Sequence, residues 1–348
     1  MEDHLFSLGQ NEVLFDSNPQ DIEFINNLVE DSYSDHTLDN TFCVFKSINN
    51  IFYLIYSNEK NSIIAYDIIY NKKINEIIKA HENYITNFRY YYEIINKRDL
   101  ILSISADDNN IKLWNINNFN CLLNIEEANK KGCLFSACFL SYNKQINIVS
   151  SNSTFNAEPI KIFDLKGNKI KTIKNQKDSV YFIDTYYDNN LSKIYLLIGS
   201  QGYTSSFDYI KNDFYKIYHD DNNECHDSII IHDKNKNEIV KLIESSKDGN
   251  IRIFDFNSGK NLQKIKVSNL YLVSICLWSE NYLFVGCGDK NIKLIEINKG
   301  KTIKKLNGHE NSVTTLKKII HPNLGECLIS QGYENNQIKL WSNKIINK

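Results

Sequence analysis

The sequence predicts an all-β fold. Two segments, residues 80–116 and 308–342, pass through the same order of features: a histidine near the start, two apolar runs separated by a turn, a polar turn and a short run that ends in tryptophan. Apolar runs of four to eight residues, bounded by Asn, Asp, Gly and Ser, fill most of the chain, as is typical of β-strands. A repeat of about 40 to 45 residues with four strands is the pattern of a β-propeller blade.

The length of the repeat predicts seven blades. From His36 to Ser342 the chain has 307 residues, which is about 44 residues for each of seven units. The last unit has too little chain after Trp341 for a fourth strand, whereas residues 22–29 form a strand ahead of the first unit. We therefore expect this N-terminal strand to close the ring, which pairs an otherwise exposed edge.

These boundaries predict an acidic arm over residues 1–20 and a single propeller domain over residues 21–348. We place the seven blades at about 36–79, 80–126, 131–174, 175–217, 224–266, 268–306 and 308–342. Four units keep a histidine in the initiating place: His36, His81, His226 and His309.

The unit starts and unit ends resemble those of the WD-repeat family. The resemblance rests on Ala80-His81, Gly308-His309, Trp114-Asn115 and Trp341-Ser342. It extends in weaker form over nearly the whole chain and implies a seven-bladed propeller. WD-repeat proteins act in ubiquitin ligases, cytoskeletal and ciliary assemblies, trafficking, RNA processing and signalling, so the resemblance implies a protein partner in a multi-protein complex.

In that family a His, a Ser or Thr, an Asp and a Trp form a hydrogen-bonded network within a blade. For blade two the resemblance implies His81, Ser103 or Ser105, Trp114, and an aspartate that is either Asp107 or Asp108. It further implies His226 and Asp248 in blade five, and His309 and Trp341 in blade seven. A buried carboxylate needs such donors, so we expect a structural role and no catalytic residue.

Composition bounds the function further. The eight cysteines form no Cys-x-x-Cys pair and lie mostly in apolar runs, so they are expected to be reduced core residues. Because neither a signal peptide nor a long apolar stretch is found, we expect a cytoplasmic protein, with nuclear, cytoskeletal or ciliary association open, and no membrane partner. Residues 1–45 carry ten carboxylates and no Lys or Arg, so the rest carries a net charge of +8.

Several polar clusters have the composition of a site but lack its spacing. His219, Cys225, His226 and His232 suit zinc chemically, but their spacing matches no ligand pattern, so no metal or other cofactor is expected. Gly300-Lys301-Thr302 lacks the first glycine of a phosphate loop and is interpreted as a turn. Scattered lysines argue against nucleic acid as a partner. The alternative function is an enzyme or metal-binding propeller with a pocket at the central channel.

The most suggestive feature is a set of aromatic residues in turns on the face that carries the histidines, the narrow face. Two of them share the local sequence Ser-Gln-Gly-Tyr, and exposed aromatics are common anchors of protein interfaces. The structural alternative is that they cap the blade cores. We predict a non-enzymatic scaffold that binds a protein or peptide partner, and no small-molecule substrate, through Tyr84, Phe155, Tyr203, Tyr271 and Tyr333.

Overall fold

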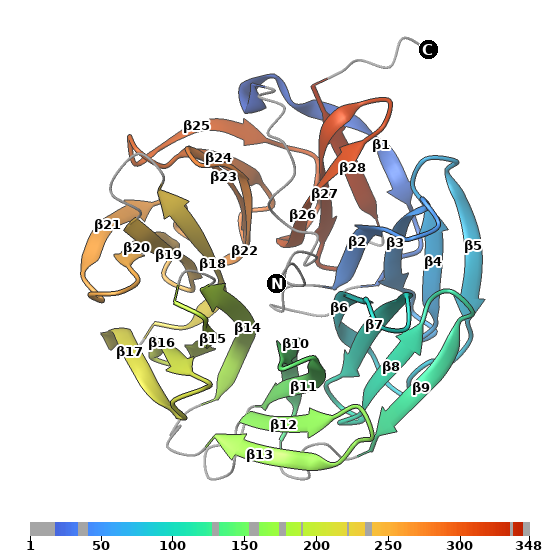
Figure 1. The fold of residues 1–348 in the computed structure, drawn as a ribbon. Helices are drawn as coiled ribbons and strands as arrows, with labels where there is room; N and C mark the ends of the chain where they lie inside the picture. The colour runs from blue at the N-terminus through green and yellow to red at the C-terminus, as the bar shows by residue number, and fades with distance from the viewer. Residues whose placement is uncertain are drawn as a thin grey trace.

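The computed structural model describes residues 18–33, 41–126, 132–152, 160–173, 179–188, 191–220, 223–233, 239–334 and 337–343. These residues contain a short 3-10 helix, η1 (Pro19–Asp21), and strands that form seven four-stranded antiparallel sheets. The sheets stand as blades around a common axis (Figure 1). The predicted seven-bladed propeller is therefore confirmed.

Blades one to six are meanders whose first strand lies nearest the axis and whose fourth strand lies at the rim (Figure 1), whereas blade seven takes its outer strand from the N-terminal part of the chain. Blade one consists of β2 (Phe42–Lys46), β3 (Phe52–Ser57), β4 (Ile63–Asp67) and β5 (Lys72–Ile77). Blade two consists of β6 (Ile85–Glu93), β7 (Arg98–Ser105), β8 (Ile111–Asn115) and β9 (Asn120–Ile125). Blade three consists of β10 (Leu134–Tyr142), β11 (Gln145–Asn152), β12 (Ile160–Asp164) and β13 (Lys169–Ile173).

The remaining blades have the same order. Blade four consists of β14 (Val180–Asp188), β15 (Lys193–Ser200), β16 (Tyr203–Asp208) and β17 (Asp213–Asp220). Blade five consists of β18 (Cys225–Asp233), β19 (Ile239–Ser246), β20 (Asn250–Asp255) and β21 (Asn261–Lys266). Blade six consists of β22 (Leu272–Ser279), β23 (Tyr282–Cys287), β24 (Ile292–Glu296) and β25 (Lys301–Leu306). Blade seven consists of β26 (Val313–His321), β27 (Gly325–Gly332), β28 (Ile338–Ser342) and β1 (Glu23–Val29).

The core is divided among the junctions between neighbouring blades. Because successive side chains of a strand point to opposite faces, one strand serves two junctions. Ile101 of β7 packs toward blade one, whereas Leu100 and Leu102 pack toward blade three. The strands are apolar on both faces for this reason, and each blade depends on its two neighbours for burial.

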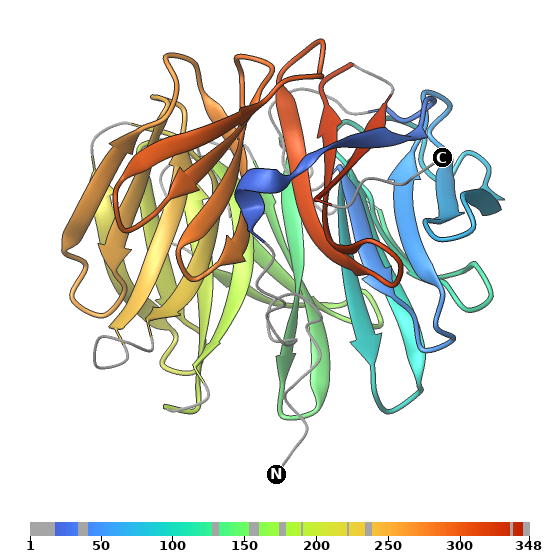
Figure 2. The same ribbon diagram turned by 90° about the horizontal axis from the view of Figure 1, so that it is seen from above.

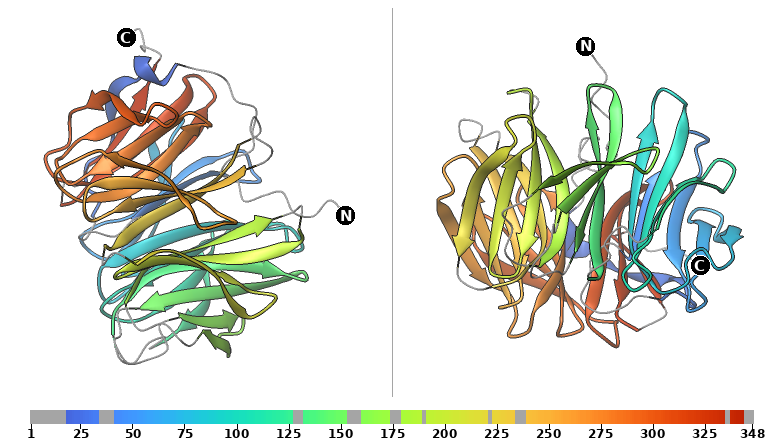
Figure 3. Two further views of the ribbon diagram at one scale, coloured as in Figure 1. Left: turned by 90° about the vertical axis from the view of Figure 1, so that its left-hand side faces the viewer. Right: turned by 90° about the horizontal axis from the view of Figure 1, so that it is seen from below.

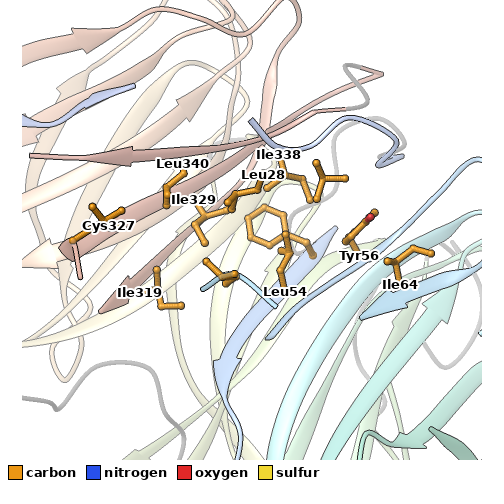
Figure 4. Packing of buried hydrophobic residues seen from close by; sticks show 13 residues of the cluster. Leu28, Leu54, Tyr56, Ile64, Ile319, Cys327, Ile329, Ile338 and Leu340 are labelled. Carbon is orange, nitrogen blue, oxygen red and sulfur yellow. The ribbon is translucent and has the colours of Figure 1, made fainter. Parts of the chain in front are cut away.

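The N-terminal strand closes the ring, as predicted. β1 pairs antiparallel with β28, with Glu23 opposite Ser342 and Phe24 opposite Trp341. Leu28 of this strand lies in the cluster that joins blades seven and one, among Ile338, Leu340 and Leu54 (Figure 4). The closure is thus a core contact as well as a backbone pairing.

A polar contact strengthens the same junction. The Thr41 hydroxyl donates to Gln331 Oε1 at 2.7 Å and lies 2.7 Å from Thr315 Oγ1. Gln331 Nε2 in turn donates to Ser32 Oγ at 3.1 Å. These buried side chains satisfy one another where the two ends of the propeller meet.

The strands run between two faces of the ring (Figure 2). Turns that join second to third strands, and connections between blades, lie on the narrow face. Turns that join first to second and third to fourth strands lie on the opposite face, here called the hairpin face, and Figure 3 shows both from the side. No helix in the described residues is long and apolar enough to cross a bilayer.

Candidate functional site

The narrow face carries a hydrogen-bonded network in blade two. His81 Nε2 lies 2.8 Å from Ser103 Oγ, which also accepts a hydrogen bond from Trp114 Nε1 at 2.8 Å. His81 Nδ1 lies 3.3 Å from Asp108 Oδ2. These distances fit a His81 imidazole whose Nδ1–H donates a hydrogen bond to the Asp108 carboxylate and whose Nε2 accepts a hydrogen bond from the Ser103 hydroxyl.

The turn geometry distinguishes Asp108 from its neighbour. Asp108 accepts hydrogen bonds from the backbone N–H groups of Glu82 and Asn110 in addition to its contact with His81. Asp107 is exposed. Asp108 therefore joins the turn to the blade connection that carries His81.

Burial keeps these histidines neutral. It lowers the pKa of His81, although the nearby Asp108 carboxylate acts in the opposite direction. In blade seven, burial and then the charge of Lys339 lower the pKa of His309 to about 3. His309 Nε2 lies 2.7 Å from Ser330 Oγ, which accepts from Trp341 Nε1 at 2.7 Å. Blades two and seven thus share the His, Ser and Trp arrangement.

Blade five departs from the prediction. His226 lies inside β18 at the register irregularity that Thr86 occupies in β6 and Thr314 occupies in β26. Its Nδ1 lies 2.7 Å from the carbonyl of Leu272. The assignment of His226 to the place of His81 is therefore wrong, because His81 precedes its first strand by four residues.

A histidine from the neighbouring blade lies in the network of blade five instead. His219 of β17 places Nε2 3.0 Å from Glu244 Oε1, and Glu244 holds the register position that Ser103 holds in blade two. Glu244 also accepts from Thr204 Oγ1 at 2.5 Å. From the sequence, His219 is a candidate only for metal binding.

The charge of this cluster is balanced by arginine. Arg252 Nη1 lies 3.6 Å from Glu244 Oε1, and Arg252 Nη2 lies 2.7 Å from Asp248 Oδ2. Asp248 thus pairs with Arg252, not with His226 as expected. Glu244 and Arg252 are buried, and a Glu and an Arg at strand centres were the signals in the sequence that could have revealed the cluster.

The candidate partner-binding residues differ in exposure. Tyr84 is 39% exposed, and its ring stacks on Tyr33 with centroids 4.5 Å apart. Tyr203 begins β16 and is partly buried. Tyr333 donates its hydroxyl proton to Glu334 at 2.8 Å and is also partly buried. Phe155 lies outside the described residues.

Tyr271 lies beside a hollow at the junction of blades five and six. Its ring lies against Gly288, where a Cβ atom would come within 3.0 Å of it. The neighbouring hollow has a volume of about 310 Å³. The residues that line it are Lys266, Val267, Ser268, Asn269, Leu270, Asp289 and Lys293.

The four residues considered for zinc do not converge. Cys225 Sγ lies 3.6 Å from the carbonyl oxygen of Asp227, and His232 Nε2 lies 3.3 Å from the hydroxyl oxygen of Tyr186. His219 and His226 have the separate contacts given above. Among the described residues, no group of three or more His, Cys, Asp and Glu side chains is placed to hold a metal ion.

Comparison with known families agrees with this geometry. The model of the WD domain, G-beta repeat, matches residues 300–342, which include β25 to β28. A search of curated proteins gave no match. With its seven four-stranded blades, the chain is a seven-bladed β-propeller, and its residues 300–342 carry a WD repeat. Propellers built from WD repeats often serve as interaction scaffolds and are usually non-enzymatic.

Proposed function

We propose that the protein is a non-enzymatic, cytoplasmic scaffold that binds a protein or peptide partner on its narrow face, within a larger complex. The observation that carries the proposal is the hollow between blades five and six. Leu270 at its edge is 49% exposed, and Tyr271 lies beside it. A concave site with an exposed apolar side chain suits the anchor residue of a partner.

Tyrosines from other blades extend this site. Tyr84, Tyr203 and Tyr333 come from blades two, four and seven and lie on the same face as the hollow. Aromatic residues contribute most of the binding energy in many interfaces. A partner lying across the narrow face could therefore contact several of them together with Leu270.

The test begins with identification of the partner by affinity purification and mass spectrometry. Tyr203→Ala, Tyr333→Ala and Leu270→Ser are each expected to weaken its binding at least tenfold, since truncating an anchor costs roughly 2 kcal/mol or more. Circular dichroism and thermal melting would establish that the variants remain folded. Unchanged binding by all three folded variants would show that the partner uses another surface.

The rim supplies the control. Lys305→Glu, on the exposed side of β25, is expected to leave binding unchanged. Its neighbour Lys304 is unsuitable as a second control. Lys304 Nζ donates to the carbonyls of Gln20 and Ile22 at 2.6 and 2.7 Å, so its replacement would disturb the start of the closing strand.

A further inference from the structure

The hairpin face carries large apolar side chains on blades one, two and four. They lie at the turns and are open to solvent, and the most exposed aliphatic side chain among them is that of Ile95, at 70%. Isolated exposed apolar residues are ordinary, but a group on one face marks an interaction surface. The group consists of Ile48, Tyr70, Ile94, Ile95, Leu191 and Ile210.

These side chains are confined to one sector of the face. At the matching turns of blades five, six and seven, the exposed residues are polar or proline: Asn257, Ser258, Asn298, Lys299, Pro322 and Asn323. Leu324 in the β26–β27 turn is 7% exposed, whereas Ile95 in the β6–β7 turn projects into solvent. The apolar tips are therefore a feature of particular blades and not a consequence of the propeller turn itself.

The first strands of blades two, three and four are long. β6, β10 and β14 each have nine residues, as do β18 and β26 outside the sector, whereas β2 within the sector has five. The β6–β7 and β10–β11 hairpins reach the lower edge of the ring in Figure 2. Ile94, Ile95 and Lys97 lie at the first of these tips, and Lys144 lies at the second.

The exposed charge of the sector is positive. Lysines in its turns and at the adjoining strand ends are exposed, namely Lys46, Lys72, Lys97, Lys144, Lys166 and Lys211. Most carboxylates there are turned inward. Asp67 Oδ1 accepts from the backbone of Ile69 and Tyr70, and Asp208 Oδ1 does so from Ile210 and Lys211.

Glu93 is likewise buried and pairs with Arg98. Asp213, at the start of β17, is an exposed carboxylate in the sector. The exposed charged side chains of the sector are therefore mostly lysines. Several of them lie in or beside the turns that carry the exposed apolar side chains.

The composition of this sector indicates the kind of partner. Protein interfaces favour Trp, Tyr and Arg and are depleted in Lys, whereas this sector has one exposed tyrosine, Tyr70, and otherwise combines Lys with Ile and Leu on separate turns. Apolar insertion together with lysine attraction to acidic headgroups is how peripheral proteins bind membranes. We propose that the hairpin face of blades one to four docks on a phospholipid membrane rich in acidic headgroups. The expectation of no membrane partner rested on the lack of a spanning segment, which such docking does not require.

The proposal is tested by co-sedimentation of the full chain with vesicles. Vesicles of phosphatidylcholine with about one-third phosphatidylserine should bind at least tenfold more tightly than pure phosphatidylcholine, and added salt should weaken the binding. Lys97→Glu and Lys144→Glu should each reduce the affinity by about fivefold or more, as expected for roughly 1 kcal/mol per lysine near the surface. Equal binding to both vesicle types would overturn the proposal.

Aliphatic variants test insertion. Ile95→Asp and Leu191→Asp should each reduce vesicle binding at least tenfold, because burying even a few methylenes is worth that much. Leu262→Asp is the matched control, since Leu262 is 44% exposed but lies on the rim strand β21. Binding unchanged by Ile95→Asp and Leu191→Asp, or abolished equally by Leu262→Asp, would contradict docking through these tips.

Two further outcomes decide against the proposal. Binding to soluble poly-glutamate with no binding to acidic vesicles would assign the face to an acidic protein partner. Absence of both would show that the sector is inert. The narrow-face variants Tyr203→Ala and Leu270→Ser should leave vesicle binding unchanged, so this inference and the proposed function can fail separately.

Discussion

At the scale of single residues, Ser103 and Asp108 show how one blade is held to the connection before it. Ser103 links His81 to Trp114, and Asp108 links His81 to two backbone N–H groups. All of these groups are withdrawn from water to a large extent. Removing one side chain of this network leaves its partner without the hydrogen bond between them, and an unsatisfied buried group costs about 1 to 3 kcal/mol of stability.

Two adjacent aspartates allow a matched test. Asp108→Ala is expected to lower the free energy of unfolding by about 1 to 3 kcal/mol, and so is His81→Ala. Asp107→Ala, one residue away and exposed, should change it by about 0.5 kcal/mol or less. Urea unfolding of the three variants measures the difference, and an equal loss at both aspartates would contradict the assigned network.

The buried histidines make stability depend on pH. The pKa of His309 is about 3 in the folded protein against 6.5 for an ordinary histidine, so between these values the unfolded chain binds more protons. Stability should therefore be complete above pH 6.5 and fall as the pH drops toward 3, by up to about 1.4 kcal/mol per pH unit. The lowered pKa of His81 acts in the same direction.

Denaturant midpoints at several pH values between 7.5 and 4.5 would measure this slope. His309→Gln should unfold at a lower denaturant concentration at pH 7.5 but show a shallower fall with acid. A variant with the same slope as the parent would mean that His309 does not carry the effect.

The buried charges of blade five predict a larger effect. Arg252→Met leaves Glu244 without its arginine in a buried site, and breaking such a pair costs about 3 to 5 kcal/mol. Lys247→Met provides the comparison, because Lys247 forms a 2.9 Å pair with Glu224 while remaining 60% exposed; exposed pairs contribute about 1 kcal/mol or less. Thermal unfolding should rank the two variants in that order, and a reversed order would contradict the proposed importance of the cluster.

At the scale of elements, the closing strand is the part on which the ring depends most. β1 fills the edge of β28, places Phe24 against Trp341 with ring centroids 5.5 Å apart, and adds Leu28 and Val29 to the junction with blade one. Without it, the edge of β28 would be unpaired and the apolar faces of blades seven and one would be exposed.

Truncation separates the strand from the arm before it. Deleting residues 1–30 should cause a large loss of thermal stability or prevent soluble expression, because both backbone pairing and core packing are lost. Deleting residues 1–15 should be far milder, since this segment ends before β1. An unchanged melting temperature after the longer deletion would show that β1 is dispensable.

At the scale of the whole molecule, burial is shared around the ring. Apolar clusters lie at each of the seven junctions between blades. A blade that unfolded alone would expose two of these clusters, so partial unfolding is costly. The closed ring therefore favours unfolding in a single cooperative step.

The tryptophans can test this expectation. Trp114 lies in blade two, Trp278 in blade six and Trp341 in blade seven, so their fluorescence reports on different parts of the ring. Fluorescence and far-ultraviolet circular dichroism should give coincident transitions in urea. A fluorescence transition that precedes the loss of β-structure would reveal independent blades.

The sequence alone determined the features that local pattern encodes. Strand runs, their turns and the repeat length predicted the seven blades, and the missing last strand predicted the closing role of residues 22–29. The resemblance to WD repeats placed His81 and Trp114 in one network and left Ser103 and Ser105 as alternatives for its hydroxyl. These predictions succeed because strand periodicity and turn residues act over a few neighbouring positions.

Only the tertiary structure decided which side chains meet across blades and which face solvent. In the structure His219, and not His226, lies beside Glu244, which also faces Arg252. Asp108, and not Asp107, contacts His81. Ile95 is exposed, whereas Leu324 is buried. Burial and the choice of hydrogen-bond partner depend on groups brought close by the ring from distant positions, and no local pattern records them.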